Sequence, residues 1–148
     1  AAVAIPAFLK YIKRAKTSEA TMNVRKIYDG SVTYFASEHV DTTGDILSAQ
    51  FPTAAGMKPA ALIGATKTEI HNWDAVETWE ALQFSIADPF LFAYQYNSEG
   101  LENASRFTAS AFGDLDEDTT GSTFVRFGSV IEMEVRGSAG VYIANELE

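Results

Sequence analysis

The chain has 148 residues, of which 47% are apolar and 12% aromatic, and its formal net charge at pH 7 is −9. This composition excludes an intrinsically disordered chain, and the length is typical of one compact domain. The absence of cysteine excludes disulfides and a cysteine nucleophile.

The N-terminal segment is apolar, passes through a proline and continues into a basic stretch. Residues 1–26 contain six basic residues and one acidic residue, so the rest of the chain is strongly acidic. An acidic body repels phosphate, and we expect it to bind no nucleic acid. The basic stretch suits anionic lipid headgroups or the acidic body of a neighbouring subunit, and a solvated helix face explains it equally well.

The first long element is predicted to be a helix from about residue 7 to residue 38. Apolar residues recur in it at helical spacing: Ala15, Met22, Ile27, Val32 and Phe35. Its first half is mostly polar and its second half is apolar enough to pack on a sheet, which indicates a helix that projects at one end. Gly30 is expected to weaken this helix by ~1 kcal/mol relative to alanine.

Residues 39–78 are rich in turn-forming residues and are predicted to be mostly loop, joining the helix region 1–38 to a sheet region 79–148. Alternation of apolar and polar residues predicts strands over 90–96, 107–111 and 131–136. One face of this sheet should be covered and the other wet. We therefore predict an α+β fold in a single domain 1–148, with a long N-terminal α-helix packed on one face of an antiparallel β-sheet.

An acidic segment between two predicted strands is the candidate for ligand chemistry. Asp114, Asp116 and Asp118 alternate along the chain, so their carboxylates can converge on a Ca²⁺ ion if the loop curls. The segment starts like an EF-hand loop, but Thr119 replaces the turn glycine and Val125 stands in place of the bidentate glutamate. Two interpretations stay open, a calcium site and a solvated acidic turn.

No motif predicts an enzyme. His39 and His71 have no partner at metal-ligand spacing, and the sequence contains neither a phosphate-binding glycine loop nor a nucleophile elbow. We expect no catalytic residues, and no cofactor other than calcium.

The N-terminal pattern resembles that of type IV pilins and type II secretion pseudopilins. The similarity rests on A-A-V-A-I-P at residues 1–6, on Phe8, Tyr11 and Arg14, and on Ser18-Glu19-Ala20. Further segments resemble the sheet of one group of bacterial pilins: 79–84, 89–96, 107–109, 113–116 and 122–124. The resemblance covers about residues 1–40 and 79–128.

This resemblance implies a structural subunit of a type IV pilus-like filament that acts in adhesion, motility or DNA uptake. The subunit would assemble with other copies through its N-terminal helix, with the help of inner-membrane assembly machinery. The residues implied in assembly are Ala1, Ala2, Val3, Ala4, Ile5, Pro6, Phe8, Lys13, Arg14 and Lys16.

The resemblance also implies that the family's methylated N-terminal residue and most of its apolar helix precede Ala1. Membrane contact is expected only through that segment, in the inner membrane before assembly, and the assembled filament is expected at the bacterial cell surface. Two alternatives remain, a type II secretion pseudopilin and a calcium-dependent extracellular binding module.

Overall fold

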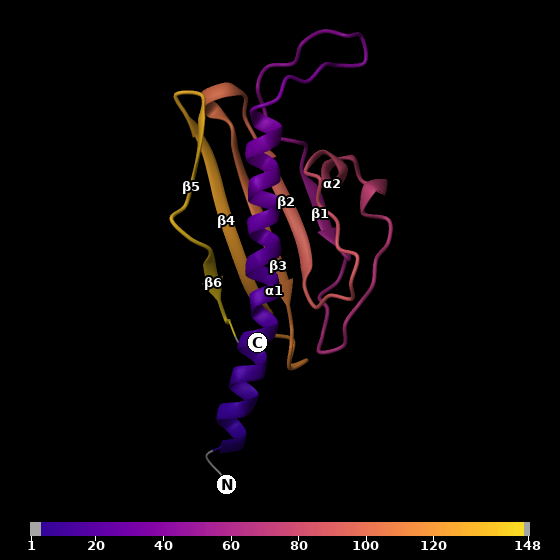
Figure 1. The fold of residues 1–148 in the computed structure, drawn as a ribbon, viewed down its shortest axis with the longest axis vertical. Coiled ribbons are helices and arrows are strands. Elements are labelled where there is room, and N and C mark those ends of the chain that lie inside the picture. Colours follow the sequence, from indigo (N-terminus) through magenta and orange to yellow (C-terminus); the bar gives the residue numbers. More distant parts are fainter. Residues whose placement is uncertain (1–3, 147–148) are drawn as a thin grey trace.

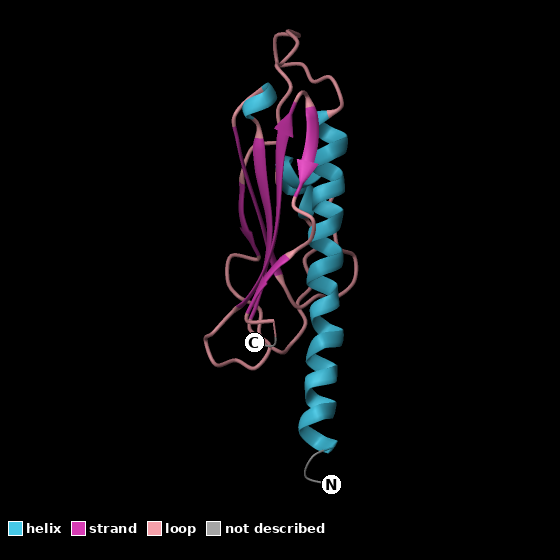
Figure 2. Cartoon of the chain, turned by 90° about the vertical axis from the view of Figure 1, so that its left-hand side faces the viewer, coloured by secondary structure: helices cyan, strands magenta, loops and turns pink. Residues whose placement is uncertain are grey.

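In the computed structural model, which describes residues 4–146, a long helix lies across one face of a six-stranded antiparallel sheet (Figure 1). Helix α1 spans Ala4–Phe35. Seen edge-on, helix and sheet form two layers, and the first part of α1 extends beyond the sheet (Figure 2). The α+β fold with its N-terminal helix on one face of an antiparallel sheet is therefore confirmed. Ala1, Ala2 and Val3 lie outside the described residues.

The strands are β1 (Ala55–Lys58), β2 (Ala93–Glu99), β3 (Arg106–Gly113), β4 (Ser122–Ile131), β5 (Glu134–Gly137) and β6 (Tyr142–Ala144). Their spatial order is β1-β2-β3-β4-β5, and β6 also pairs with β4. The connections contain helix α2 (Glu77–Ala81) and two 3₁₀ turns, η1 (Trp73–Ala75) and η2 (Glu102–Ala104). The first strand of the region 79–148 thus begins only at Ala93.

The region predicted to be loop contributes one edge strand to the sheet. β1 pairs with β2 through Ala55 opposite Tyr96 and Lys58 opposite Tyr94, with an irregularity between the two pairs. The segment Ala-Gly-Met-Lys shows no alternation and contains a glycine, so its own strand preference is weak. The free edge of β2 supplies the pairing that makes this segment a strand.

The prediction of one strand over residues 131–136 is wrong, because these residues form a hairpin. β4 ends at Ile131 and β5 begins at Glu134. Between them Glu132 and Met133 have φ values of 53° and 63°, and positive φ at both central residues is the geometry of a type I′ turn. The Met133 N–H donates to Asn103 Oδ1 at 2.7 Å. A contact from η2 therefore supports a turn that lacks the usual asparagine or glycine.

The buried face of α1 differs in part from the predicted apolar stripe. Met22 is 56% exposed and Ala15 is also exposed, so these two members of the apolar pattern lie off the buried face. The side chains that face the sheet recur every three or four residues: Ala20, Val24, Ile27, Ser31 and Phe35. A polar residue can lie on this buried face when its side chain forms a hydrogen bond. The Ser31 hydroxyl, for example, donates to the Ile27 carbonyl at 2.8 Å.

Aromatic side chains dominate the face of the sheet that α1 covers. Tyr94, Tyr96, Phe107 and Phe124 are buried there. Tyr28 of α1 packs against Phe107 with 5.5 Å between ring centroids. A second aromatic cluster extends the core around β1, η1 and α2: Trp73, Trp79, Phe84 and Phe90. Each such side chain removes about 150–250 Å² from water, so these rings provide most of the core.

Gly30 has a structural reason that the sequence alone does not reveal. A Cβ atom built at Gly30 would lie 2.2 Å from the carbonyl oxygen of Leu82. The segment that follows α2 therefore touches the backbone of α1 here, and this oxygen cannot turn away as a side chain would. The contact needs a glycine even though glycine disfavours the helix.

We predict that Gly30→Ala destabilises the protein by about 1–2 kcal/mol, because overpacking against the backbone outweighs the helix propensity that alanine adds. Urea unfolding curves measure this difference. Ser18→Ala, at an exposed position of the same helix, is the control and should be close to neutral. A more stable Gly30→Ala variant would contradict the close contact with Leu82.

Candidate functional site

The first half of α1 exposes large apolar side chains. Ile5 is 63% exposed, Phe8 62%, Leu9 56% and Tyr11 71%. They lie on the part of the helix that extends past the sheet (Figures 1 and 2). Side chains gathered in this way mark an interaction surface more often than a bare monomer surface. We call residues 5–16 of α1 the projecting segment.

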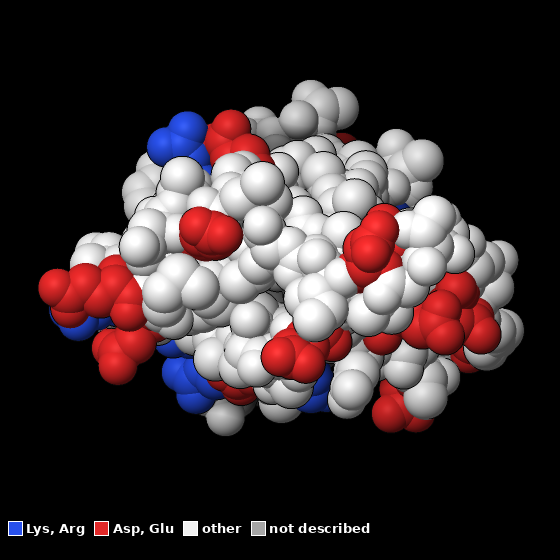
Figure 3. Space-filling model, turned by 90° about the horizontal axis from the view of Figure 1, so that it is seen from above, with Lys and Arg blue, Asp and Glu red and all other residues white. Residues whose placement is uncertain are grey.

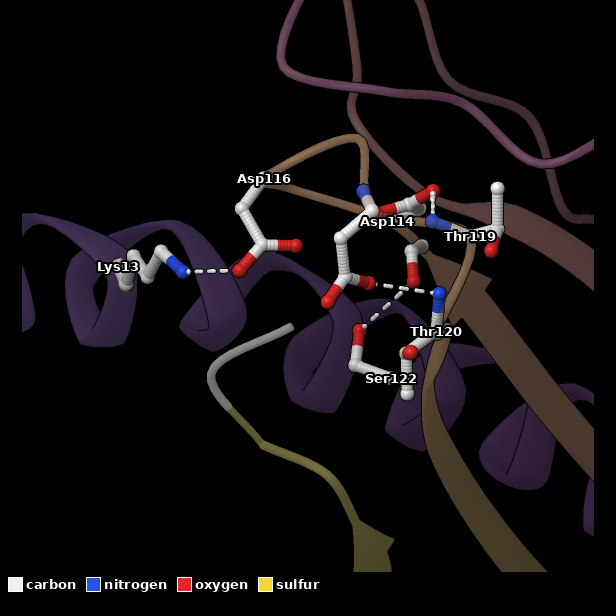
Figure 4. A network of polar contacts seen from close by, with 8 residues as sticks. Lys13, Asp114, Asp116, Thr119, Thr120 and Ser122 are labelled. Carbon is white, nitrogen blue, oxygen red and sulfur yellow. Dashed lines mark hydrogen bonds and ion pairs between the residues drawn. The ribbon is translucent and has the colours of Figure 1, made fainter.

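Basic residues share the projecting segment with these apolar ones. Lys10 and Arg14 are exposed, whereas Lys13 and Lys16 are half-buried. Lys13 Nζ lies 2.8 Å from Asp116 Oδ2, which ties the helix to the loop between β3 and β4 (Figure 4). Of the residues implied in assembly, Ile5, Pro6, Phe8 and Arg14 are therefore exposed, and Lys13 already has a partner within the chain.

The acidic loop between β3 and β4 curls so that its three aspartates converge. One carboxylate oxygen from each of Asp114, Asp116 and Asp118 lies within 4.8 Å of the others. Positive φ values of 61° at Glu117 and 76° at Thr119 produce the bend. The alternation in the sequence allows this convergence if the loop curls, and these side chains offer the hard oxygen ligands that Ca²⁺ prefers.

Backbone N–H groups and Lys13 offset part of the negative charge of this loop. Asp114 is 9% exposed, and its carboxylate accepts the N–H groups of Asp118 at 3.2 Å and Thr119 at 3.1 Å. Asp118 accepts the N–H of Thr120 at 2.7 Å (Figure 4). These contacts compensate part of the loop's negative charge from within the chain, and the three carboxylates still offer oxygen ligands to a cation.

Two polar side chains of α1 connect the helix to the sheet, one to β2 and one to the residues just before β2. Neither of them was assigned a role from the sequence. Glu19 Oε1 accepts the Leu91 N–H at 2.9 Å, and Asn23 Nδ2 donates to the Tyr94 hydroxyl at 2.8 Å. Burial raises the pKa of Glu19, while the Leu91 N–H and the charge of Lys67 act to lower it. Burial also raises the pKa of Tyr94 above its ordinary value. The sequence signal that could have revealed these contacts is the spacing of Glu19 and Asn23, two polar residues four positions apart on the helix face that packs on the sheet.

Comparisons of the chain with protein-family models, with curated proteins and with solved structures find no match. Within residues 4–146, no helix has both the length and the apolar character needed to cross a bilayer.

We predict that Glu19→Gln changes the pH dependence of stability. Because folding raises the pKa of Glu19, this carboxyl contributes most below its ordinary pKa, and the contribution is lost as pH rises and the half-buried group ionises. A glutamine side chain at this position would keep an acceptor for the Leu91 N–H and stay neutral. The variant should therefore gain stability relative to the native chain between about pH 4 and pH 7.

Melting temperatures of both chains across this range measure the effect. Glu38→Gln, at an exposed position beyond the end of α1, removes one carboxylate without touching the helix–sheet interface and serves as the control. A constant difference between Glu19→Gln and the native chain at all pH values would show that burial does not perturb Glu19.

Proposed function

We propose that this chain is a structural subunit of a type IV pilus-like surface filament that acts in adhesion, motility or DNA uptake. The observation that carries the proposal is the division of α1 into an embedded half and the projecting segment. Among residues 4–146, Phe8, Leu9 and Tyr11 stay mostly exposed although they are large and apolar. Burying such a side chain is worth about 1.5–3 kcal/mol. Association of the projecting segments of several copies would supply that burial.

The arrangement of the molecule suits a filament in which helices pack at the centre and sheets lie outside. The projecting segment extends beyond the sheet at one end of the described molecule, so packing it against a different part of the next copy would join two different surfaces (Figure 2). Contacts of this kind generate open helical assemblies when the rotation does not close. The resemblance of residues 1–20 to pilins supports the same proposal.

Charge is distributed along the molecule in a way that favours head-to-tail order. The projecting segment carries Lys10 and Arg14, both exposed. Acidic side chains predominate at the opposite end, which Figure 3 views along the long axis. They include Glu38 and Asp45, which follow the end of α1, and Glu102 in η2. The basic end of one copy would therefore attract the acidic end of the next.

The gene region upstream of codon 1 tests the proposal directly. We expect it to encode a short leader, a cleavage site and an apolar helix that carries a glutamate. Filaments sheared from cells should then bind antibodies raised against residues 4–146. A conventional signal peptide before Ala1, or filaments without the antigen, would refute the proposal.

We predict that the double change Arg14→Glu and Lys16→Glu in the full-length protein lowers the yield of sheared filaments and leaves the domain folded. The reversed charges would repel the acidic end of the neighbouring copy, and the defect should lessen at high salt because salt screens exposed charges. Quantitative immunoblots of the sheared fraction measure the yield.

The matched control is Arg25→Glu with Lys26→Glu, which reverses two exposed charges on the same helix beside the sheet. This control should assemble normally. Equal loss of filaments in both double variants would mean that net charge, and not the position of the basic residues, governs assembly.

A calcium-dependent binding module is the second candidate, and the observation that favours it is the convergence of Asp114, Asp116 and Asp118. A bound cation would stabilise the loop by neutralising three neighbouring carboxylates. A type II secretion pseudopilin with a calcium site combines both candidates. Ca²⁺ would bind through one carboxylate oxygen of each of these three aspartates.

For this second candidate we predict that Ca²⁺ added to the chelator-treated chain releases or absorbs heat and raises the melting temperature. Binding to the folded state alone stabilises it by about 2.7 kcal/mol at a hundredfold excess over the dissociation constant. Asp116→Asn should abolish both effects, whereas Asp88→Asn, at an exposed position outside the loop, should retain them. No heat and no shift would leave the loop as an acidic turn.

A further inference from the structure

The face of the sheet turned away from α1 contains a hollow of about 760 Å³. Its walls come from β2, β3, β4 and β5, close to the end of the sheet opposite the projecting segment. This volume lies in the range of about 300–1,000 Å³ that small-molecule sites occupy. The hollow shares no residue with the acidic loop or the projecting segment.

Strand register explains why these side chains meet. Since Phe107 and its alternate neighbours face α1, Arg106 and Thr108 point to the other face. Arg106 lies opposite Ser129, and Ser129 lies opposite Arg136, so the three form a row across β3, β4 and β5. Neighbouring strands lie about 4.7–4.9 Å apart. The small Ser129 thus stands between two long guanidinium side chains, and this difference in size helps form the hollow.

The charges around the hollow are balanced. Arg106 Nε donates to Glu99 Oε1, and an Arg136 guanidinium nitrogen lies 3.6 Å from Glu134 Oε2. Each guanidinium has further N–H donors, and each carboxylate has further acceptor positions. An anion would meet Glu99 in the lining and the overall charge of −9, and a cation would meet the two arginines. An uncharged ligand faces neither penalty.

Three short polar side chains of the hollow have no partner within residues 4–146. Asn97, Thr108 and Ser129 line it, and their side chains make no hydrogen bond to any described residue. Beside them Phe127 and Ile131 are each 49% exposed. The hollow therefore offers an apolar surface ringed by both donors and acceptors.

We propose that this hollow binds a neutral saccharide. A sugar ring has one face of C–H groups, which packs on the Phe127 ring, and a rim of hydroxyl groups. Each hydroxyl both donates and accepts, so the rim fits Asn97, Thr108 and Ser129 together with the spare donors of Arg136. No charged group on the ligand is needed, which agrees with the balanced charges of the site. This proposal does not depend on assembly, because the purified chain contains the whole site.

Titration of the isotope-labelled chain with neutral sugars tests the proposal by NMR. The probes are glucose, galactose, mannose and N-acetylglucosamine, with their trisaccharides, and glucuronate is the charged comparison. We expect at least one neutral probe to shift the amide signals of residues 106–108, 127–131 and 136–138 at millimolar concentration, more strongly than glucuronate does. Weak affinity of this order is typical of a site that buries a single ring.

Phe127→Ala should weaken the binding about tenfold or more, because it removes the surface that the ring covers. Tyr142→Ala is the matched control: this aromatic residue is 61% exposed on the same face but outside the hollow, and its loss should leave binding unchanged. Melting curves establish that both variants fold. For a Phe127→Ala chain that does not fold, Ser129→Ala replaces it, with the same expectation of weaker binding.

Three results would overturn the proposal. The first is no shift with any neutral probe at millimolar concentration. The second is equal or stronger binding of glucuronate, which would make the ligand an anion. The third is binding that Phe127→Ala and Ser129→Ala leave unchanged, which would place the sugar elsewhere on the chain.

Discussion

The second half of α1 and the aromatic face of the sheet bury one another, and the other features of the molecule take their positions from this contact. Val24 and Ile27 of the helix and Tyr94 and Tyr96 of the sheet are wholly buried. A helix gains most of its stability from such packing, since helix propensity alone is marginal in water. A sheet with one apolar face likewise requires a cover. The covered half of α1 thus anchors the uncovered half, which carries the exposed apolar residues.

Polar contacts fix where along the sheet the helix sits, which apolar packing alone specifies poorly. Lys13 binds Asp116 of the loop at one end of the sheet, Glu19 accepts the Leu91 N–H, and Asn23 donates to Tyr94. They attach the helix at three levels along its length. Half-buried polar groups need their partners, so sliding the helix by one turn would leave several of them unsatisfied. This register determines how much of α1 projects.

Covering one face of the sheet leaves the other face open for a different use. The helix side is filled so closely that a Cβ atom at Gly137 would lie 2.3 Å from the Tyr28 hydroxyl oxygen. On the open side, Phe127 and Tyr142 stay largely exposed. The two faces therefore separate two roles: the helix side stabilises the fold and presents the projecting segment, and the open side offers the hollow between β2 and β5.

Periodicity in the sequence was enough to predict the long helix, its embedded second half and the α+β class, because the patterns involved are made by residues close together in the chain. It allowed the convergence of Asp114, Asp116 and Asp118 only on condition that the loop curls. It failed for β1, whose strand conformation depends on the free edge of β2. It also failed at the turn of Glu132, where residues of η2 assist. The ion pair of Lys13, whose partner is 103 residues away, and the hollow across four strands arise only when distant segments meet. The local sequence pattern indicates which residues face water and which face the core. The tertiary structure sets strand register and helix position, and these determine which side chains become neighbours.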